Sequence, residues 1–168
     1  FGPAPMYAEH RKPALDAFGP IFVHGYGQGE SPNTITYLSA LDHERLHRAG
    51  DTRLTSVGVA RTGVEIRIPH DADNPLPAGQ IGEVLVRGDV VMSGYWNNEV
   101  ATEDTLRGGW LHTGDIGRVD ETGYLTLLDR LKDLIISGGN NIYPREIEEV
   151  LLQHPTVAEC AVIGVTDE

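Results

Sequence analysis

The spacing of apolar and polar positions predicts that the middle of the chain is mainly β-structure. Between positions 64 and 68, three aliphatic residues alternate with two charged ones, which indicates a strand with one buried face. Residues 82–96 continue in strand-like sequence. Residues 117–129 predict a hairpin that turns at Asp120–Gly123, where short polar residues and glycine favour chain reversal.

The N-terminal part adds a helix and a strand. A helix interrupted at Pro13 is predicted over residues 6–18, and a strand over residues 21–26 leads into a glycine-rich bend. Near the other end, residues 134–142 predict a second hairpin, because glycine and asparagine tolerate positive φ.

The last predicted elements are a helix over residues 144–155 and a strand over residues 156–165. Proline at the first helical position and a second proline at the end support these helix limits. The buried stripe of this helix is expected to comprise Ile147, Val150 and Leu151. The predicted fold class is therefore mixed α/β with a large β content.

Composition and charge narrow the function classes. The 168 residues carry a formal net charge of -12, which disfavours nucleic acid and anionic membrane surfaces as partners. No apolar stretch approaches the length of a membrane span, and no signal-peptide pattern is found, so we expect no integral membrane association. The single cysteine, Cys160, cannot form an internal disulfide, which fits a cytoplasmic protein.

A short histidine motif offers one candidate metal site. Residues 43–47, HERLH, match a zinc-binding helix in which His43 and His47 are ligands and Glu44 is the general base. The flanking residues are polar and no third ligand is indicated. A zinc hydrolase is therefore the weakest functional hypothesis.

Two other segments indicate a nucleotide site. In residues 25–30, GYGQGE, Tyr26 offers a flat face to a base and Glu30 offers a carboxylate to magnesium, although a tight turn explains the segment equally well. In residues 109–117, GWLHTGDIG, Asp115 is suited to accept hydrogen bonds from both hydroxyls of a ribose; the alternative is a turn-forming aspartate.

Taken in order, these segments resemble the adenylate-forming enzymes, which comprise acyl-CoA synthetases, luciferases and peptide-synthetase adenylation domains. Residues 26–30, YGQGE, match the pattern Y-G-x-T/S-E except at Gly29, and G-W-x-x-T-G-D is present at residues 109–115. The long pattern D/G-R-x-K/D-D-x-I-x-x-x-G-x-x-I-x-P-x-E-I-E is present at residues 129–148, and GPAPM at residues 2–6 is similar to G-G-A-P-L/M. The likeness covers essentially the whole chain, and residues 135–148 are most similar to acyl-CoA synthetases.

The resemblance implies a two-step ligase reaction. A carboxylic or fatty acid attacks the α-phosphate of ATP to give an acyl-adenylate and pyrophosphate, and the thiol of coenzyme A then displaces AMP. ATP, magnesium and coenzyme A are the implied cofactors. Adenylation gives a poor electrophile a good leaving group, so catalysis is largely positioning and charge neutralisation.

The resemblance also implies a domain arrangement. Residues 1–55 are expected to end a large N-terminal α/β domain, and residues 56–128 to form a distorted β-barrel-like subdomain. Residues 129–133 are expected to be a hinge, and residues 134–168 the start of a small α+β C-terminal lid domain. The charged sequence of the hinge, DRLKD, is also typical of a simple turn.

Nucleotide contacts are implied for several segments. Tyr26 packs on the adenine while its flanking glycines keep the backbone close. Asp115 accepts from the ribose hydroxyls, and Arg130 donates to the ribose from the opposite side. The implied cofactor-binding residues are Ala4, Gly25, Tyr26, Gly27, Asp115 and Arg130.

Three further residues are implied in catalysis. Glu30 helps to hold magnesium on the phosphates, and Gly139 belongs to a loop that approaches the site during thioester formation. Lys132 is the hinge about which the lid domain turns. A charged hinge stays hydrated in both orientations, so the rotation breaks no buried contact.

The chain departs from the family pattern at two positions. Gly29 stands where relatives carry a hydroxyl, and Pro3 replaces a glycine. A Ser/Thr/Gly-rich phosphate loop like that of the family is not found in the sequence. The family's C-terminal catalytic lysine is not found either, because the only lysines are Lys12 and Lys132. We therefore expect an internal fragment that is inactive alone. A stand-alone AMP- or ATP-binding module without catalysis is the alternative.

Overall fold

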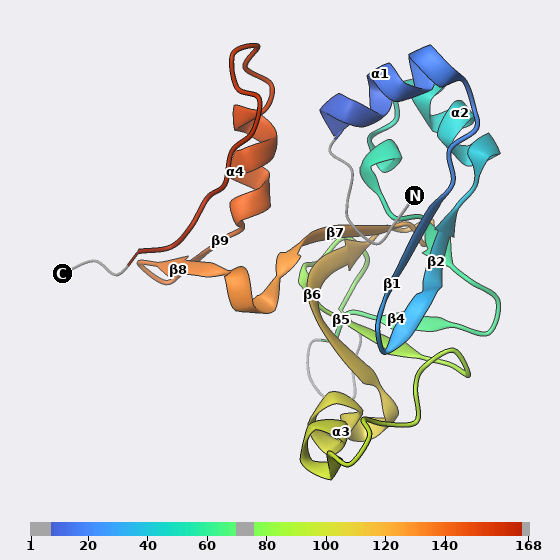
Figure 1. Ribbon diagram of the computed structural model, residues 1–168, viewed down its shortest axis with the longest axis vertical. Coiled ribbons are helices and arrows are strands. Elements are labelled where there is room, and N and C mark those ends of the chain that lie inside the picture. The colour runs from blue at the N-terminus through green and yellow to red at the C-terminus, as the bar shows by residue number, and fades with distance from the viewer. Residues whose placement is uncertain (1–7, 70–75, 166–168) are drawn as a thin grey trace.

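The computed structural model describes residues 8–69 and 76–165 and has a mixed α/β fold, as the sequence predicts (Figure 1). Helices α1 and α2 lie at one end, α3 lies at the other, and β8, β9 and α4 extend to one side. The helices are α1 (Ala8–Phe18), α2 (Ala40–Ala49), η1 (Thr52–Thr55), α3 (Glu99–Thr105), η2 (Arg107–Gly109), η3 (Leu131–Asp133) and α4 (Pro144–Leu151). The strands are β1 (His24–Gln28), β2 (Ser31–Leu38), β3 (Val59–Ala60), β4 (Glu65–Arg67), β5 (Gly82–Arg87), β6 (Leu111–Val119), β7 (Leu125–Arg130), β8 (Ile135–Ser137) and β9 (Asn140–Ile142).

Within residues 8–69 and 76–165, the strands form three antiparallel sheets, ordered β1-β2-β3, β4-β5-β6-β7 and β8-β9. The barrel-like subdomain expected over residues 56–128 is, in the part of it that the structure describes, an open four-stranded sheet. Its edge strands β4 and β7 do not pair with each other in the described residues, and β4 pairs with β5 through three residues.

Two backbone hydrogen bonds join the first sheet to the second. The amide of Val57 donates to the carbonyl of Leu125, and the amide of Leu125 donates to the carbonyl of Gly58, both at 2.8 Å. These bonds hold the start of β7 against the segment that leads into β3. As a result, the β1–β2 hairpin and the β6–β7 hairpin share one apolar core.

That core lies between the two larger sheets. Each fully buried aliphatic side chain in it stabilises the fold by about 1.5–3 kcal/mol. Its buried members are Tyr26, Ile35, Val57, Val64, Ile68, Val84, Val86, Leu111 and Leu125. A smaller cluster joins α1 and α2 to the sheet and consists of Leu15, Leu38, Leu46 and Leu54.

Helix α1 is continuous, so the predicted interruption at Pro13 is wrong. Pro13 is exposed, and water can therefore hydrate the carbonyl that the missing amide leaves unpaired. The helix ends instead at Gly19, whose φ of 73° is left-handed and whose amide donates to the carbonyl of Leu15.

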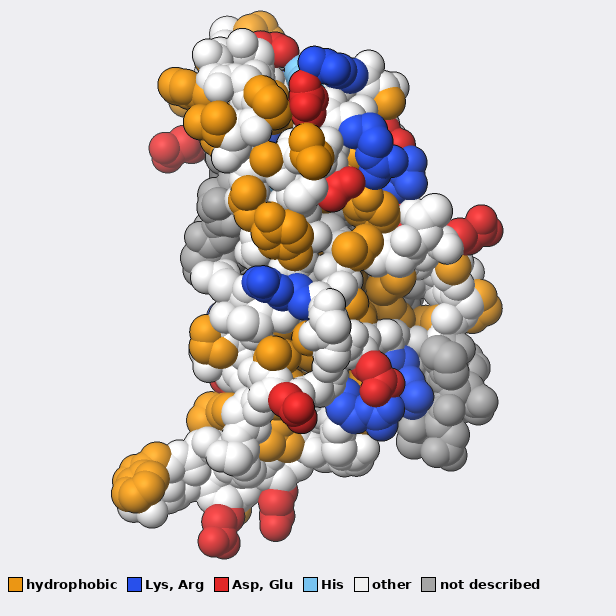
Figure 2. Space-filling model, turned by 90° about the vertical axis from the view of Figure 1, so that its right-hand side faces the viewer, with side chains coloured by type: hydrophobic (Ala, Val, Ile, Leu, Met, Phe, Trp, Pro, Cys, Tyr) orange, Lys and Arg blue, Asp and Glu red, His pale blue; other side chains and the backbone are white. Residues whose placement is uncertain are grey.

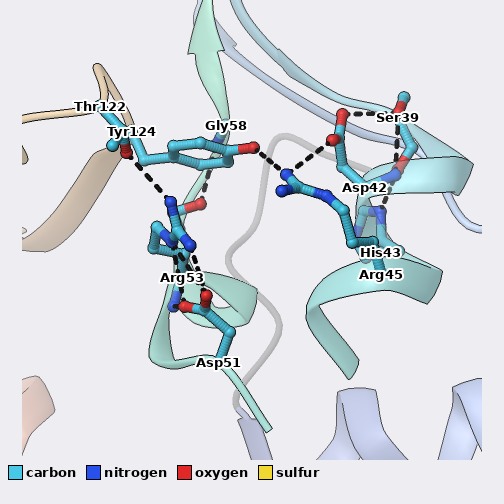
Figure 3. A network of polar contacts seen from close by, with 10 residues as sticks. Ser39, Asp42, His43, Arg45, Asp51, Arg53, Gly58, Thr122 and Tyr124 are labelled. Carbon is cyan, nitrogen blue, oxygen red and sulfur yellow. Dashed lines mark hydrogen bonds and ion pairs between the residues drawn. The ribbon is translucent and has the colours of Figure 1, made fainter. Parts of the chain in front are cut away.

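A polar network fixes α2 and η1 against the turn of the β6–β7 hairpin (Figure 3). Arg45 donates to the Tyr124 hydroxyl at 2.9 Å and pairs with Asp42 at 3.1 Å. Arg53 donates to the Thr122 hydroxyl at 3.2 Å and lies over the ring of Tyr124. The predicted turn at residues 120–123 is thus confirmed and is anchored to the helical layer.

The C-terminal segment agrees with only part of the sequence prediction. The β8–β9 hairpin is confirmed, with positive φ at Gly138 and Gly139. The predicted strand over residues 156–165 is wrong, because its described residues are irregular. Apolar alternation favours a strand only where a neighbouring strand can complete the hydrogen bonds, and no ladder forms with this segment in the described chain.

The predicted buried stripe of α4 is also wrong for this chain. Ile147 is 40% exposed, Val150 is 65% exposed and Leu151 is 43% exposed. Helix α4 begins at Pro144, as predicted, and lies near the end of β7, where the Arg145 amide donates to Asp129 at 3.2 Å. Its amphipathic sequence forms the helix, but no described sheet covers its apolar face.

The surface carries charges of both signs. On the face drawn in Figure 2, several acidic side chains lie beside basic ones. Hydrophobic side chains occupy much of the surface between these charged groups. No helix in the described part of the chain is both long enough and apolar enough to cross a bilayer.

The β1–β2 hairpin generates a stability prediction at Gly27. A Cβ there would lie 2.2 Å from the Asn33 amide nitrogen and 2.4 Å from the Ser31 carbonyl oxygen, so Gly27→Ala must displace β2. We expect the free energy of unfolding to fall by about 1–3 kcal/mol. At Gly25 the nearest atom is 3.6 Å away. Gly25→Ala is therefore the control, and equal destabilisation by both variants in denaturant titrations would contradict the packing argument.

Candidate nucleotide site

Asp115 is the buried centre of the candidate site. It lies on β6 opposite Arg130 on β7, and it is 5% exposed. The Arg130 Nε donates to Asp115 Oδ1 at 2.8 Å, and the Tyr26 hydroxyl on β1 donates to Oδ2 at 2.5 Å. Three strands from two sheets therefore converge on one carboxylate.

The carboxylate keeps accepting capacity in this arrangement. An ionised aspartate has about four acceptor positions, of which Tyr26 and Arg130 use two. The Arg130 side chain is half-exposed and covers the group from the solvent side. A movement of Arg130 would therefore open Asp115 to a ligand with two adjacent hydroxyls.

Burial sets the electrostatics of the site. It raises the pKa of Asp115, with smaller contributions from Glu30 and Glu83, while the hydrogen bond from Tyr26 and the charge of Arg130 act in the opposite direction. Burial, followed by the charge of Asp115, also raises the pKa of Tyr26. Tyr26 therefore remains a protonated donor at neutral pH.

The predicted role of Tyr26 as an adenine platform stays a prediction. Its side chain is 4% exposed and packs in the apolar core, and its hydroxyl is committed to Asp115. The flanking Gly27 lets β1 approach β2 closely, whereas Gly25 makes only ordinary contacts. Ala4, the other residue implied near the adenine, lies outside the described residues.

A pocket of about 600 Å³, here named the nucleotide pocket after the candidate ligand, is lined by Gly114 and Arg130, whereas Asp115 itself is not a lining residue. Its volume suits a small-molecule ligand. The pocket includes Arg130, whose guanidinium connects it to Asp115. Its lining residues are Gln28, Gly29, Glu30, Glu83, Tyr95, Asp104, Thr105, Arg107, His112, Thr113, Gly114, Arg130 and Leu131.

Glu30 brings a carboxylate to the same pocket. Its Oε1 accepts a hydrogen bond from the Tyr95 hydroxyl, and this bond is the main cause that raises the pKa of Tyr95. No group of three metal-ligating side chains occurs among residues 8–69 and 76–165. One carboxylate nevertheless suits magnesium, which is commonly bound by one or two carboxylates together with substrate phosphates.

The sequence did not identify Tyr95, Glu83 or His112 as site residues. Glu83 accepts from the His112 Nδ1 at 2.9 Å and from the Gly114 amide at 3.1 Å. The sequence feature that could have identified Glu83 is its position as the one charged residue in the apolar strand sequence GEVLV, residues 82–86. That feature does not reveal which loop the glutamate contacts.

The predicted hinge residue Lys132 and the predicted loop residue Gly139 do not line the nucleotide pocket. Lys132 is exposed in η3 and lines a second hollow of about 720 Å³ between β7 and α4, whereas the adjacent Leu131 lines the nucleotide pocket. Gly139 is exposed in the β8–β9 turn and lines neither hollow. Glu30 and Arg130 therefore line one pocket, and Arg130 connects it to Asp115, which Tyr26 contacts in turn.

The HERLH motif has a structural explanation. His43 is fully buried in α2 and its Nδ1 lies 2.9 Å from the Ser39 carbonyl, while the His47 Nε2 lies 2.8 Å from Asp16. Arg45, from the same motif, joins the network in Figure 3. These side chains hold α2 in place, and none of them lines the nucleotide pocket.

Comparison with known families identifies the chain. The AMP-binding enzyme family model matches residues 1–96, and the model of the AMP-binding enzyme C-terminal domain matches residues 146–168. The chain therefore belongs to the AMP-binding enzyme family, as its motifs predict.

Curated relatives are coenzyme A ligases. The medium/long-chain-fatty-acid–CoA ligase FadD8 of Mycobacterium tuberculosis is 42% identical over 92% of this chain and 26% of its own length. A feruloyl-CoA synthase of Amycolatopsis is 43% identical over 99% of this chain and 32% of its own length. A 2-succinylbenzoate–CoA ligase of Bacillus cereus is 46% identical with the same coverage. The chain thus spans about a third of these relatives or less.

Solved structures share the fold at similar identity. The O-succinylbenzoate coenzyme A synthetase of Bacillus subtilis in complex with AMP has a TM-score of 0.84 and 38% identity, over 99% of this chain and 33% of its own. An amide bond synthetase of Marinactinospora thermotolerans has a TM-score of 0.85 and 40% identity, over 99% of this chain and 32% of its own.

The raised pKa of Asp115 predicts an unusual pH dependence of stability. The pKa of Asp115 is higher in the folded protein than the value of about 3.9 in the unfolded chain. Protonation of Asp115 therefore stabilises the fold fully below about pH 3.9, and this stabilisation is lost as pH rises through the folded pKa. Asp115→Asn should therefore be more stable than the wild type at neutral pH. Denaturant titrations across pH should show this advantage vanishing in acid.

Asp120 is the control with the opposite sign. Burial acts to raise its pKa, but hydrogen bonds from Thr122 and Tyr124 outweigh it and lower the pKa. Ionised Asp120 therefore stabilises the fold at pH values above its pKa in the unfolded chain. This stabilisation is lost as pH falls through the lower pKa of the folded protein. Asp120→Asn should be less stable than the wild type at neutral pH. The same sign for both variants would contradict the account of Asp115.

Proposed function

We propose that the enzyme containing this chain is an ATP-dependent acyl-CoA synthetase. It activates a carboxylic acid as an acyl-adenylate and transfers the acyl group to coenzyme A. The observation that carries this proposal is the convergence of Tyr26, Asp115 and Arg130 beside a ligand-sized pocket. Its support from relatives is the set of coenzyme A ligases that match almost the entire chain.

In this proposal the site grips the ribose of ATP. Asp115 accepts hydrogen bonds from the two ribose hydroxyls, and Arg130 donates to the same sugar. Burial raises the free-energy cost of leaving Asp115 without donors, so a sugar with two hydroxyls is a favourable partner. Holding the sugar fixes the α-phosphate relative to the attacking carboxylate.

Glu30 is proposed to hold magnesium on the ATP phosphates. A relative from Bacillus subtilis was solved in complex with ATP and a magnesium ion. Bound at Glu30, the ion would neutralise charge that develops on the phosphates. Tyr95 restrains one oxygen of Glu30 and leaves the other available to the cation.

The acid attacks the α-phosphorus, and the bond from that phosphorus to the bridging oxygen of pyrophosphate breaks. The thiol of coenzyme A, after losing its proton, attacks the acyl carbon and AMP leaves with the electron pair. Residues 129–133 are proposed as the hinge between the two steps. Lys132 and Asp133 line the hollow beside α4, whereas Leu131 lines the nucleotide pocket.

An amine acceptor is the second candidate. The 40% identity to an amide bond synthetase supports it, because the same acyl-adenylate can be transferred to nitrogen instead of sulfur. Supplying the adenylate-forming enzyme with coenzyme A and with simple amines in parallel separates the two, since the first proposal predicts a thioester as the main product.

Loss of the Arg130 guanidinium should weaken nucleotide binding. For Arg130→Leu we expect the KM for ATP in pyrophosphate exchange to rise about tenfold or more, because a charge-assisted hydrogen bond is lost. Arg118→Leu is the matched control, since Arg118 is an exposed arginine of β6 outside the nucleotide pocket. Equal KM values for the wild type and Arg130→Leu would overturn the ribose contact.

A hinge at Lys132 predicts a selective kinetic defect. Lys132→Pro fixes φ near about -65° and should slow thioester formation while pyrophosphate exchange continues. Lys132→Ala, which removes the charge but keeps backbone freedom, is the control and should leave both steps close to the wild type. Single-turnover measurements of each step provide the test, and equal loss of both in Lys132→Pro would argue against a hinge.

A further inference from the structure

Asp115 belongs to a bulge in β6. Glu83 on β5 pairs with Ile116, and Leu85 pairs with His112. Between these two pairs β5 advances by two residues (83 to 85) and β6 by four (112 to 116). The additional residues of β6 therefore leave the regular ladder. Such bulges redirect side chains and occur frequently beside active sites.

A bulge has amide groups that the ladder no longer satisfies, and here side chains satisfy them. The Thr113 hydroxyl donates to the Val84 carbonyl at 2.7 Å and accepts from the Asp115 amide at 3.1 Å. The Gly114 amide donates to Glu83 Oε1 at 3.1 Å. Glu83 is thus the side chain from the neighbouring strand that fixes the centre of the bulge.

Glu83 is itself held from two more directions. Its Oε2 accepts from the His112 Nδ1 at 2.9 Å, and the Arg107 guanidinium lies 3.8 Å from the same oxygen. Its side chain is 18% exposed, so these contacts form in a partly desolvated place, where charge-assisted hydrogen bonds are stronger. Gly114 has φ of 66°, which lets the chain make this turn without strain.

We propose that Glu83 is a positioning residue for ribose recognition: by binding the Gly114 amide and His112, it fixes the bulge that aims Asp115 at the sugar hydroxyls. This inference rests on the proposed function, because it takes Asp115 as the ribose contact. It adds a residue of β5 that holds the loop without touching the nucleotide hydroxyls.

Removing the glutamate releases the bulge but leaves the rest of the pocket in place. In Glu83→Ala the Gly114 amide and His112 lose their acceptor, and the orientation of Asp115 is no longer fixed. Glu83→Gln keeps an acceptor for Gly114, and its amide group can donate to His112 when the ring proton is on Nε2. The amide variant should therefore restore function that alanine loses.

The test compares AMP with 2′,3′-dideoxy-AMP by calorimetry on the enzyme that contains this chain. The wild type should bind AMP at least about tenfold more tightly, because only AMP has hydroxyls for Asp115. Glu83→Ala should lose most of that ratio, because AMP binding weakens much more than dideoxy-AMP binding. Glu83→Gln should keep it.

The possible outcomes separate the two proposals. If the wild type itself does not discriminate, the ribose role of Asp115 fails, and the inference about Glu83 fails with it. If the wild type discriminates and Glu83→Ala discriminates equally well, only the role of Glu83 is overturned. Should Glu83→Ala not fold, Glu83→Asp replaces it, because the shorter carboxylate cannot reach both donors. A ratio in Glu83→Asp equal to that of the wild type then overturns the role of Glu83.

Discussion

The structure of this site depends on one aspartate that is held inside the protein by two side-chain donors. Asp115 is almost fully buried, and burial favours its protonated form. Tyr26 and Arg130 oppose that tendency by donating to separate oxygens, and they come from strands far apart in sequence. Much of the surrounding architecture follows, because two sheets must share a core for β1 to reach β6 and β7 at this point.

The sequence allowed a candidate nucleotide site to be named because short, ordered motifs carry its residues. Glu30, Asp115 and Arg130 were named from such motifs, and the fold brings them to one region. Tyr95 and Glu83 could not be predicted, because their contacts depend on a loop path and on the register of a bulge. Alternation of residue types specifies which face of a strand is buried, but not where an extra residue interrupts its pairing.

The two errors in the C-terminal elements have a common cause. The apolar pattern of residues 156–165 and the stripe of α4 describe surfaces that need a partner, and the described chain gives them none. Hairpins were predicted correctly because each strand has its neighbour a few residues away, as in β6–β7 and β8–β9. Local pairing can be derived from a short stretch of sequence, whereas burial depends on elements that lie elsewhere.

The central claim is that Asp115 and Arg130 contact one sugar. A crystal structure of the enzyme with bound AMP tests it most directly. The account predicts both ribose hydroxyl oxygens within about 3 Å of the Asp115 carboxylate, with the Arg130 guanidinium against the same ribose. A ribose bound elsewhere, with Asp115 still closed between Tyr26 and Arg130, would contradict it.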